Sequence, residues 1–401
     1  MRFLIQGSSR SWAGDIEHCM YEIDGKPAIY WTVKRVYDNF DNAIVQLIAP
    51  EYDKGGELEL LKNDFDELEI FYGFDSSPLN RMIESTKDLN DNEHFVRINA
   101  LNFQFDIDFI KEMYKIAKKN NYDCVKLKDD FPVHFVGEIY KVSSLKLVFE
   151  ILENKQIDNY IYHHIHPKFI LMRLKYFNTK YYIPTKKITN KEILLYKEKM
   201  KQVMVETRHN AQGKNSISAG DQLAFHYELS ELFLNEKNIN NGTILDIACG
   251  TGYGTTRFDK HGLEIYGADI DEEQILSNQR IYSNTNIKFL QEDVLNLSFD
   301  SNYFDVILSM ETIEHVDPDK MLISLKRVLK RNGYLIISTP QNSMKECVNP
   351  QHIYEYSLDE IVSIVSKYFN IEKIIGIKAG KIYFEDDPIG ANTMIFAKKI
   401  D

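Results

Sequence analysis

Residues 244–254 read ILDIACGTGYG, an apolar run with one acid that is followed by three glycines at alternate positions. The run Ile244–Ala248 is short and apolar, which is typical of a fully buried parallel strand. Gly250, Gly252 and Gly254 carry no Cβ, so the backbone there can turn tightly and approach a ligand closely. The stretch therefore predicts a strand, a tight turn and a helix start that together form a ligand site.

Strand-like and helix-like segments alternate after this loop. The strand-like runs are LEIYGAD (263–269), NIKFLQED (286–293), FDVILSM (304–310) and GYLIIST (333–339). Such alternation predicts a doubly wound parallel sheet, in which ligands bind at the carboxyl ends of the strands. Two later strand-like runs, 371–377 and 393–399, predict a closing hairpin.

Three cofactors compete for the glycine loop. A P-loop for ATP or GTP needs a lysine and a Ser or Thr after the glycines, whereas Thr255, Thr256 and Arg257 follow here. A dinucleotide fingerprint needs glycine at its sixth position, which is Thr255. S-adenosylmethionine carries no phosphate and needs a close backbone approach and an acid for its ribose, so the loop favours this cofactor.

Three acids stand where that cofactor needs polar partners. Asp269 ends the second strand and can accept both ribose hydroxyls, and Asp293 ends the third strand, near the expected place of the adenine amino group. Asp246 lies next to the loop and can orient the methionyl ammonium, directly or through water.

The blocks LDIACGTGYG, QEDVLNL, FDVILSMETIEHV and NGYLIISTP, together with the acid at Asp269, resemble class I S-adenosylmethionine-dependent methyltransferases. The resemblance covers roughly residues 220–401 and implies a seven-stranded doubly wound sheet with S-adenosylmethionine as cofactor. The residues expected to bind the cofactor are Asp246, Gly250, Gly252, Gly254, Asp269, Ile270, Asp293, Val294 and Ser309.

The segments after the fourth and fifth strands indicate which class of molecule accepts the methyl group. Enzymes that methylate bases carry an Asn/Asp-Pro-Pro-aromatic block after the fourth strand, where this chain has SMETIEHV. Together with NPQHIYEYSLDEI (349–361), this segment resembles small-molecule O-methyltransferases, including those for sugars and quinone precursors. His315 and His352 are candidate general bases, since an imidazole can take a hydroxyl proton near neutral pH. The alternatives are a structural His315 and transfer by proximity alone. Glu311 and Glu314 pair with either histidine or are solvated.

The first 150 residues carry a second set of blocks. FLIQGSSRS, YEIDGKPAIYWTVKRV, EIFYGFDSSPLNRM and HFVRINALNFQFDIDFI resemble cytidylyltransferases of surface-polysaccharide sugars, of the acylneuraminate and spore-coat types, which implies a Rossmann-like, glycosyltransferase-A-like sheet. Asp15 replaces the family's triphosphate-binding lysine and Leu101 its metal-binding aspartate, which argues against nucleotidyl transfer. Ser8, Ser9 and Arg10 are the candidates for contacting a nucleotide.

Metal ions, nucleic acid and membranes are disfavoured as partners. His163, His164 and His166 stand close together, but histidine beside proline and aromatic residues is more often structural, so no metal ligand is assigned. The net charge of −12 disfavours attraction to nucleic acid or an anionic membrane. No apolar stretch approaches the ~20 residues of a membrane span, and the four scattered cysteines fit a reduced, cytoplasmic enzyme.

The chain is therefore predicted to be an α/β protein with a nucleotidyltransferase-like domain over 1–182, a helical connector over 183–219 and a methyltransferase domain over 220–401. The predicted activity is O-methylation of a sugar or nucleotide-linked precursor in surface-polysaccharide biosynthesis, with the first domain holding that small-molecule substrate. Two alternatives stay open: a bifunctional cytidylyltransferase and methyltransferase, and a methyltransferase whose first domain is a protein-interaction scaffold. The sequence leaves the oligomeric state open.

Overall fold

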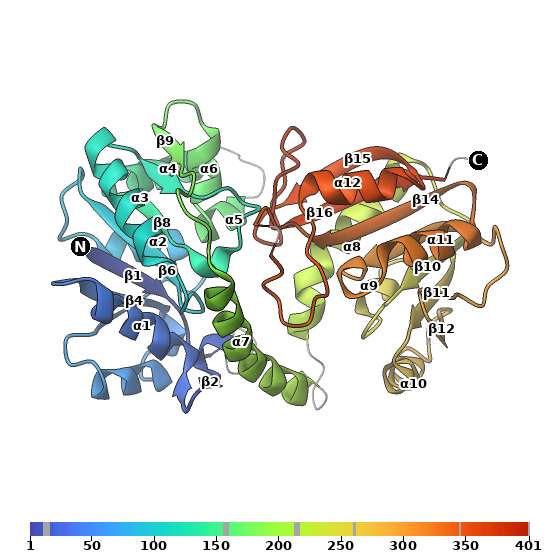
Figure 1. The fold of residues 1–401 in the computed structure, drawn as a ribbon, viewed down its shortest axis with the longest axis horizontal. Helices are drawn as coiled ribbons and strands as arrows, with labels where there is room; N and C mark the ends of the chain where they lie inside the picture. The colour runs from blue at the N-terminus through green and yellow to red at the C-terminus, as the bar shows by residue number, and fades with distance from the viewer. Residues whose placement is uncertain (11–16, 155–159, 212–216, 260–261, 345, 400–401) are drawn as a thin grey trace. The chain divides into compact units, whose positions relative to one another are not determined.

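The computed structural model describes residues 1–401 except 11–16, 155–159, 212–216, 260–261, 345 and 400–401 (Figure 1). The chain forms two compact units, each with its own seven-stranded sheet. Unit 1 comprises residues 1–128 and 132–211, and unit 2 comprises residues 129–131 and 212–401. The predicted α/β class with two sheets is confirmed.

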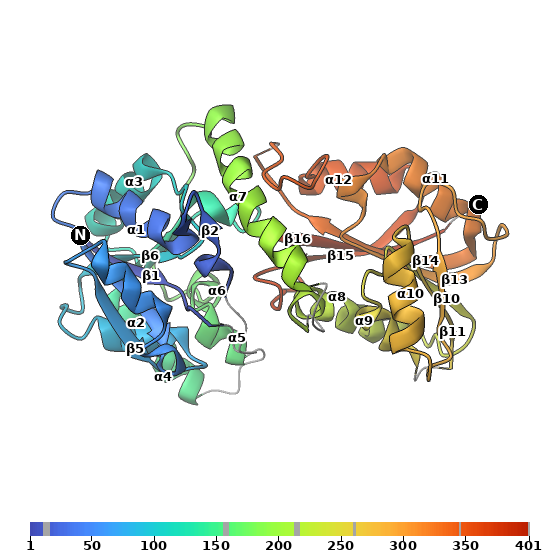
Figure 2. The same ribbon diagram turned by 90° about the horizontal axis from the view of Figure 1, so that it is seen from below.

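Unit 1 is built on a mixed sheet with the strand order β5-β4-β1-β6-β8-β7-β9. Its strands are β1 (Arg2–Gln6), β4 (Ile44–Pro50), β5 (Glu69–Gly73), β6 (His94–Asn99), β7 (Cys124–Lys126), β8 (Glu138–Lys141) and β9 (Thr179–Tyr181), with a separate hairpin of β2 (Glu22–Ile23) and β3 (Lys26–Pro27). Its helices are α1 (Ala28–Asn39), α2 (Pro78–Ser85), α3 (Ile107–Asn120), α4 (Val142–Asn154), α5 (Tyr160–Ile165), α6 (Lys168–Arg173) and α7 (Asn190–Ala211), with the 3-10 turns η1 (His18–Met20), η2 (Glu51–Asp53), η3 (Glu57–Asn63) and η4 (Val133–Phe135). Figure 2 shows α1 and α3 on one side of this sheet and α2 and α4 on the other.

Unit 2 is built on a sheet with the order β12-β11-β10-β13-β14-β16-β15. Its strands are β10 (Thr243–Ile247), β11 (Glu264–Asp269), β12 (Lys288–Gln291), β13 (Phe304–Met310), β14 (Leu329–Pro340), β15 (Asn370–Ile377) and β16 (Asn392–Lys398). Its helices are α8 (Ile217–Glu236), α9 (Tyr253–Thr256), α10 (Glu272–Ile281), α11 (Pro318–Val328) and α12 (Leu358–Ser366), with the 3-10 turn η6 (Ile313–His315). The first five strands along the sheet are parallel, and β15 and β16 form the predicted antiparallel hairpin.

Side-chain caps mark where the helices of unit 2 begin. The Asp271 carboxylate accepts from Gln274 N at 3.1 Å at the start of α10, and Asp317 caps α11 in the same way. Ser357 forms a capping box with Glu360 at the start of α12. Each cap satisfies backbone N–H groups that the first helical turn leaves without a partner, so the chain changes from loop to helix at these residues.

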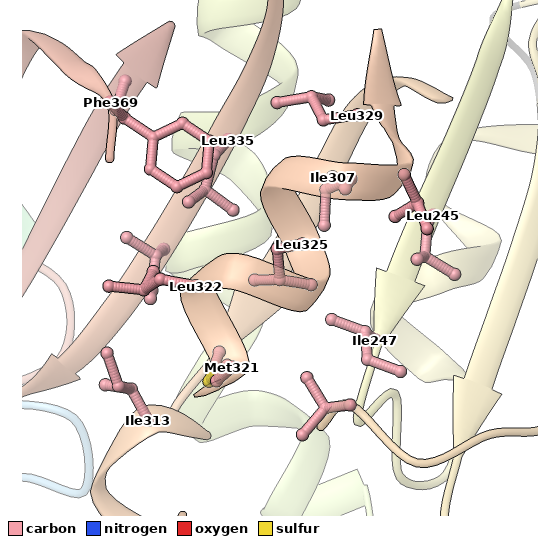
Figure 3. Packing of buried hydrophobic residues seen from close by; sticks show 14 of the residues in the cluster. Leu245, Ile247, Ile307, Ile313, Met321, Leu322, Leu325, Leu329, Leu335 and Phe369 are labelled. Carbon is pink, nitrogen blue, oxygen red and sulfur yellow. The ribbon is translucent and has the colours of Figure 1, made fainter. Parts of the chain in front are cut away.

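Two apolar layers cover the two faces of the unit 2 sheet. Figure 3 shows Met321, Leu322 and Leu325 of α11 packed over strand residues that include Ile247 and Ile307. Figure 2 shows α8 and α9 on the side of the sheet opposite to α11 and α12, where α8 packs against the sheet in a second cluster. Burial on both faces explains why the parallel strands read as continuous apolar runs.

The carboxyl ends of the central strands of unit 2 meet at one edge of the sheet. In β10, Ile247 is in register with Ala268 of β11 and with Ser309 of β13. The ends of these three strands and the loops that follow them are therefore neighbours, and they contain most of the residues predicted to bind a ligand. In the described part of the chain, no helix is both long and apolar enough to cross a membrane.

Candidate active site

The loop after β10 turns sharply at the carboxyl edge of the unit 2 sheet. Ala248, Gly250 and Gly252 have φ angles of +59°, +50° and +72°, a region that glycine enters without steric cost. Gly250 N donates to Asp269 Oδ2 at 2.9 Å. This bond ties the glycine loop to the end of β11, so the predicted ribose-binding acid lies against the predicted loop.

The three glycines of the loop are needed for three different reasons. A Cβ at Gly250 would meet no described atom within 4 Å, so the loop faces open space there. A Cβ at Gly252 would lie 2.8 Å from the Phe289 ring, and one at Gly254 would overlap the ring of Tyr227. Gly250 therefore leaves room for a ligand, whereas Gly254 leaves room for a side chain of α8.

Asp246 is buried behind the loop and connects three elements. Its carboxylate accepts from the Thr255 hydroxyl at 2.6 Å and from the Tyr227 hydroxyl at 3.2 Å. Burial raises the pKa of Asp246 to about 7. These bonds join β10 to α8 and α9, and a role of Asp246 toward a ligand ammonium stays a prediction.

The remaining predicted cofactor residues lie at the ends of β11, β12 and β13. Ile270 is 67% exposed next to Asp269, and Asp293 is exposed while Val294 is buried. Ser309 is completely buried, and its Oγ has no hydrogen-bond partner among the described residues. The edge thus combines an exposed apolar side chain, one exposed and one half-buried carboxylate, and a buried hydroxyl.

His315 and His352, which are 37 positions apart in the chain, lie against each other. Their rings stand nearly perpendicular, with centroids 4.9 Å apart. His315 Nδ1 is 3.1 Å from the carbonyl oxygen of Gln351, and His352 Nδ1 is 2.9 Å from Glu355 Oε1. The fold therefore brings the two candidate bases into one cluster.

Glu314 lies by His315 and Glu355 by His352, and Glu311 lies near Glu314. Burial raises the pKa of Glu311 and the pKa of Glu314, and the nearby Glu311 raises the latter further. Burial also opposes the charge of Glu355, but hydrogen bonds from His352 and from the residues at 349 and 342 outweigh it and lower the pKa of Glu355. Glu355 is therefore the partner of His352, whereas Glu311 bonds to Ser338 instead.

Glu314, His315 and His352 are the described residues that could hold a metal ion, since one ligand atom from each lies within 4.8 Å of the others. The pKa of Glu314 is raised, so its carboxyl group would have to lose a proton to bind a cation. In the described chain, no such group includes His163, His164 or His166. His164 Nδ1 instead lies 3.0 Å from the Ser77 hydroxyl.

In unit 1, the predicted nucleotide-contacting residues follow β1. Ser9 is buried; its backbone N donates to Asp53 Oδ2 at 2.7 Å and its hydroxyl donates to the other oxygen of the same carboxylate. Ser8 bonds to the backbone of Arg10, which is exposed. Ser9 thus holds the loop in place, Arg10 faces solvent, and Asp15 lies outside the described residues.

The comparisons with known proteins concern unit 2. A protein family described as "Methyltransferase domain" matches residues 245–337, which contain the loop, Asp269 and His315. Unit 2 contains a class I methyltransferase domain. The family's cofactor is S-adenosylmethionine.

Two curated relatives are similar to parts of this chain. A ubiquinone biosynthesis O-methyltransferase of Coxiella burnetii is 32% identical over 105 residues, which is 25% of this chain and 45% of that protein. A phosphoethanolamine N-methyltransferase of Plasmodium falciparum is 34% identical over 131 residues, which is 31% of this chain and 48% of that protein. The chain thus spans less than half the length of either relative.

Among solved structures, a SAM-dependent methyltransferase of Methanosarcina mazei is 19% identical to this chain, with a TM-score of 0.36, over 42% of this chain and 97% of that chain.

The residues of the methyltransferase domain fit S-adenosylmethionine. Gly250 provides open space beside the backbone, and each Asp269 oxygen accepts one backbone N–H, from Gly250 and Asp271, and can accept a further bond. Ile270 offers an apolar surface, and Ser309 Oγ is buried without a hydrogen bond to a described residue. A ligand with a ribose, a flat base and polar groups suits this set.

Sequence reasoning missed Tyr227 and Glu355, which organise the site. Tyr227 lies 19 positions before Asp246 and contacts it only in the folded unit, so no local sequence pattern predicts this contact. Glu355 stands three residues after His352, and an acid at that spacing was a signal that could have been used.

Replacing Asp269 by alanine is expected to weaken S-adenosylhomocysteine binding by roughly ten- to a hundredfold, because charged hydrogen bonds to the ribose are worth about 1.5–3 kcal/mol. Isothermal titration calorimetry measures the change. Asp269→Asn keeps the size of the side chain and removes its charge, so it measures the contribution of the charge alone. Asp300→Ala, which removes an exposed acid of the same unit, is the matched control. Unchanged affinity in Asp269→Ala would contradict the ribose assignment.

Proposed function

We propose that this chain uses S-adenosylmethionine to methylate a hydroxyl oxygen of a sugar or of a nucleotide-linked sugar precursor in surface-polysaccharide biosynthesis. The observation that carries the proposal is the contact between the rings of His315 and His352. These residues follow β13 and β14, and β13 pairs with β10, the strand that leads into the glycine loop. A hydroxyl that accepts a methyl group must lose its proton, and an imidazole is suited to take it.

The chain's own residues divide the work of the reaction. When bound, S-adenosylmethionine supplies an electrophilic methyl group on a sulfonium. Asp269 and the Gly250 backbone hold the cofactor, and the loops after β13 and β14 place the acceptor. Glu314 Oε1 is buried without a hydrogen bond to a described residue, and its raised pKa keeps a proton on the carboxyl. The Glu314 side chain is fully buried beside His315, with Oε1 3.9 Å from His315 Nε2, so it supports the turn that carries this histidine.

Nitrogen is the second candidate for the accepting atom. The Plasmodium relative is named for N-methylation of phosphoethanolamine and the Coxiella relative for O-methylation in ubiquinone biosynthesis. Their similarity to this chain is comparable, so the relatives support methyl transfer to either atom. The histidine pair favours a hydroxyl, because a neutral amine attacks without prior loss of a proton.

Unit 1 is proposed to be a nucleotidyltransferase-like domain, with 183–219 as connector, that holds the acceptor by its nucleotide. Leu101, after β6, offers no oxygen ligand for a metal ion, which supports a domain without transferase activity. Having both units in one chain raises the effective concentration of the acceptor near the methyltransferase domain. A working cytidylyltransferase and a protein-interaction scaffold remain the competing roles.

The test is methyl transfer from isotope-labelled S-adenosylmethionine to a pool of cytidine-linked sugars, other nucleotide-linked sugars and phosphoethanolamine, read by mass spectrometry. A labelled nucleotide sugar is the expected product. Label on the amine alone would replace the proposed oxygen by nitrogen. CTP turnover with magnesium and a sugar would establish the bifunctional alternative, and cofactor binding without any labelled product would overturn the proposed acceptor class.

A further inference from the structure

The segment between β14 and α12 is organised around one buried carboxylate. Glu355 is 3% exposed. Its Oε2 accepts from Asn342 Nδ2 at 2.7 Å, and its Oε1 accepts from Asn349 N at 2.8 Å and from His352 Nδ1 at 2.9 Å. Donors from both ends and from the middle of the segment thus meet on this side chain.

The bond to Glu355 decides which nitrogen of His352 carries hydrogen. A carboxylate can only accept a hydrogen bond, so the hydrogen of the neutral imidazole lies on Nδ1 and the lone pair lies on Nε2. No hydrogen bond from the described residues engages His352 Nε2, and this nitrogen is not among the buried unsatisfied atoms. The basic nitrogen is therefore directed away from Glu355 and is open to a ligand.

The surrounding backbone fixes the position of the ring. Ile353 N donates to the carbonyl oxygen of Glu314 at 2.8 Å, which ties the residue after His352 to the turn that carries His315. Ile353 itself is 70% exposed, so the segment is anchored by its backbone while the side chain faces outward. His352 is consequently held on both sides, by Glu355 through its ring and by η6 through the chain.

We propose that Glu355 is a positioning residue that fixes His352 as the Nδ1–H tautomer, so that Nε2 takes the proton of a hydroxyl methyl acceptor. The inference rests on the proposed function for the hydroxyl. Methyl transfer forms the C–O bond and breaks the S–C bond, whose electron pair stays on sulfur. The O–H electron pair stays on oxygen, and the proton moves to His352 Nε2.

Long-range ¹H–¹⁵N NMR of the histidine side chains tests this in the full-length, EDTA-treated protein without any acceptor. His352→Gln identifies the His352 signals by their loss. The wild type is expected to show a protonated Nδ1 and an unprotonated, pyridine-like Nε2. In Glu355→Leu, which removes the acceptor, the pattern should move toward the Nε2–H tautomer, which free imidazole side chains favour.

Asn342→Ala is the matched control, because it removes a bond to Glu355 Oε2 and leaves the Glu355–His352 pair in place. It should keep the wild-type tautomer. An Nε2–H tautomer in the wild type overturns the proposal even if Glu355→Leu fails to fold, and so does an unchanged pattern in a folded Glu355→Leu.

The same variants separate this inference from the proposed function. Glu355→Leu should bind S-adenosylhomocysteine like the wild type, because Glu355 contacts none of the residues assigned to the cofactor. With an accepted hydroxyl substrate it should lower kcat and leave KM nearly unchanged. A tautomer that depends on Glu355 in a protein that methylates no hydroxyl would uphold the positioning role and contradict the proposed function.

Discussion

Replacing Gly254 by alanine is expected to destabilise unit 2, whereas the same change at Gly250 should leave it folded and weaken cofactor binding. The Gly254 Cβ would overlap the buried Tyr227 ring, and such overpacking costs about 1–3 kcal/mol or more. The Gly250 Cβ would meet no described atom. Its cost is the strain of a φ of +50° for alanine, about 1–2 kcal/mol, together with the loss of space for a ligand.

Urea unfolding and S-adenosylhomocysteine titration separate the two glycines. Gly254→Ala should lose stability in the absence of any ligand, and Gly250→Ala should lose affinity by a larger factor than stability accounts for. In a double-mutant cycle, Gly254→Ala should cost much less when Tyr227 is also alanine, because the overlapping ring is gone. Equal costs in both backgrounds would show that Tyr227 is not the reason for the glycine.

Local patterns were sufficient for much of unit 2. FDVILSM coincides with β13 at Phe304–Met310, and the runs at 371–377 and 393–399 became the β15–β16 hairpin. These segments are buried on both faces or pair with their neighbour in sequence, so their apolar runs are sufficient to predict strands. The β14 strand begins earlier than predicted, at Leu329, because Phe304 pairs with that residue across a register shift.

Tertiary contacts limited what could be predicted of the site. Two separate motifs indicated His315 and His352, but their contact depends on how the segment after β14 folds back to η6. The reason for Gly254 lies in Tyr227, which is far outside the glycine motif. In unit 1, the buried state of Ser9 depends on Asp53, 44 positions away. The residue types therefore predicted the chemistry of the site. Which of these residues can contact a ligand, and which hold the others in place, became clear only from the folded structure.

Replacing Glu138 by glutamine is expected to destabilise unit 1 by about 3–5 kcal/mol, because it leaves two buried cations without their anion. Glu138 of β8 lies opposite Arg97 of β6. It accepts from Arg97 Nη1 at 3.1 Å and from Lys168 Nζ at 2.6 Å. Arg97 also donates to Gln6 at 2.8 Å, but a neutral amide does not balance the charge.

Hydrogen exchange of β6 and β8 amides at pH 7 measures this loss, and a protected amide should exchange roughly a hundredfold to a few thousandfold faster. Peptides of unit 2 from the same digest report whether the effect is confined to unit 1. Asp64→Asn, which breaks the exposed Lys26–Asp64 pair, is the control and should change little. Comparable effects of the two substitutions would show that the Glu138 cluster is no stronger than a surface pair.

The pH dependence of this difference follows from the charge of Glu138. Burial by itself raises the pKa of Glu138, but Lys168 and Arg97 outweigh it and lower that pKa to about 2. A depressed carboxyl pKa stabilises the folded state above the unfolded pKa and loses this effect as pH falls toward the folded pKa. The stability gap between wild type and Glu138→Gln should therefore be full at neutral pH, begin to shrink below about pH 5 and be nearly gone near pH 2. A gap that stays constant over this range would mean that packing of the side chain, rather than its charge, stabilises the cluster.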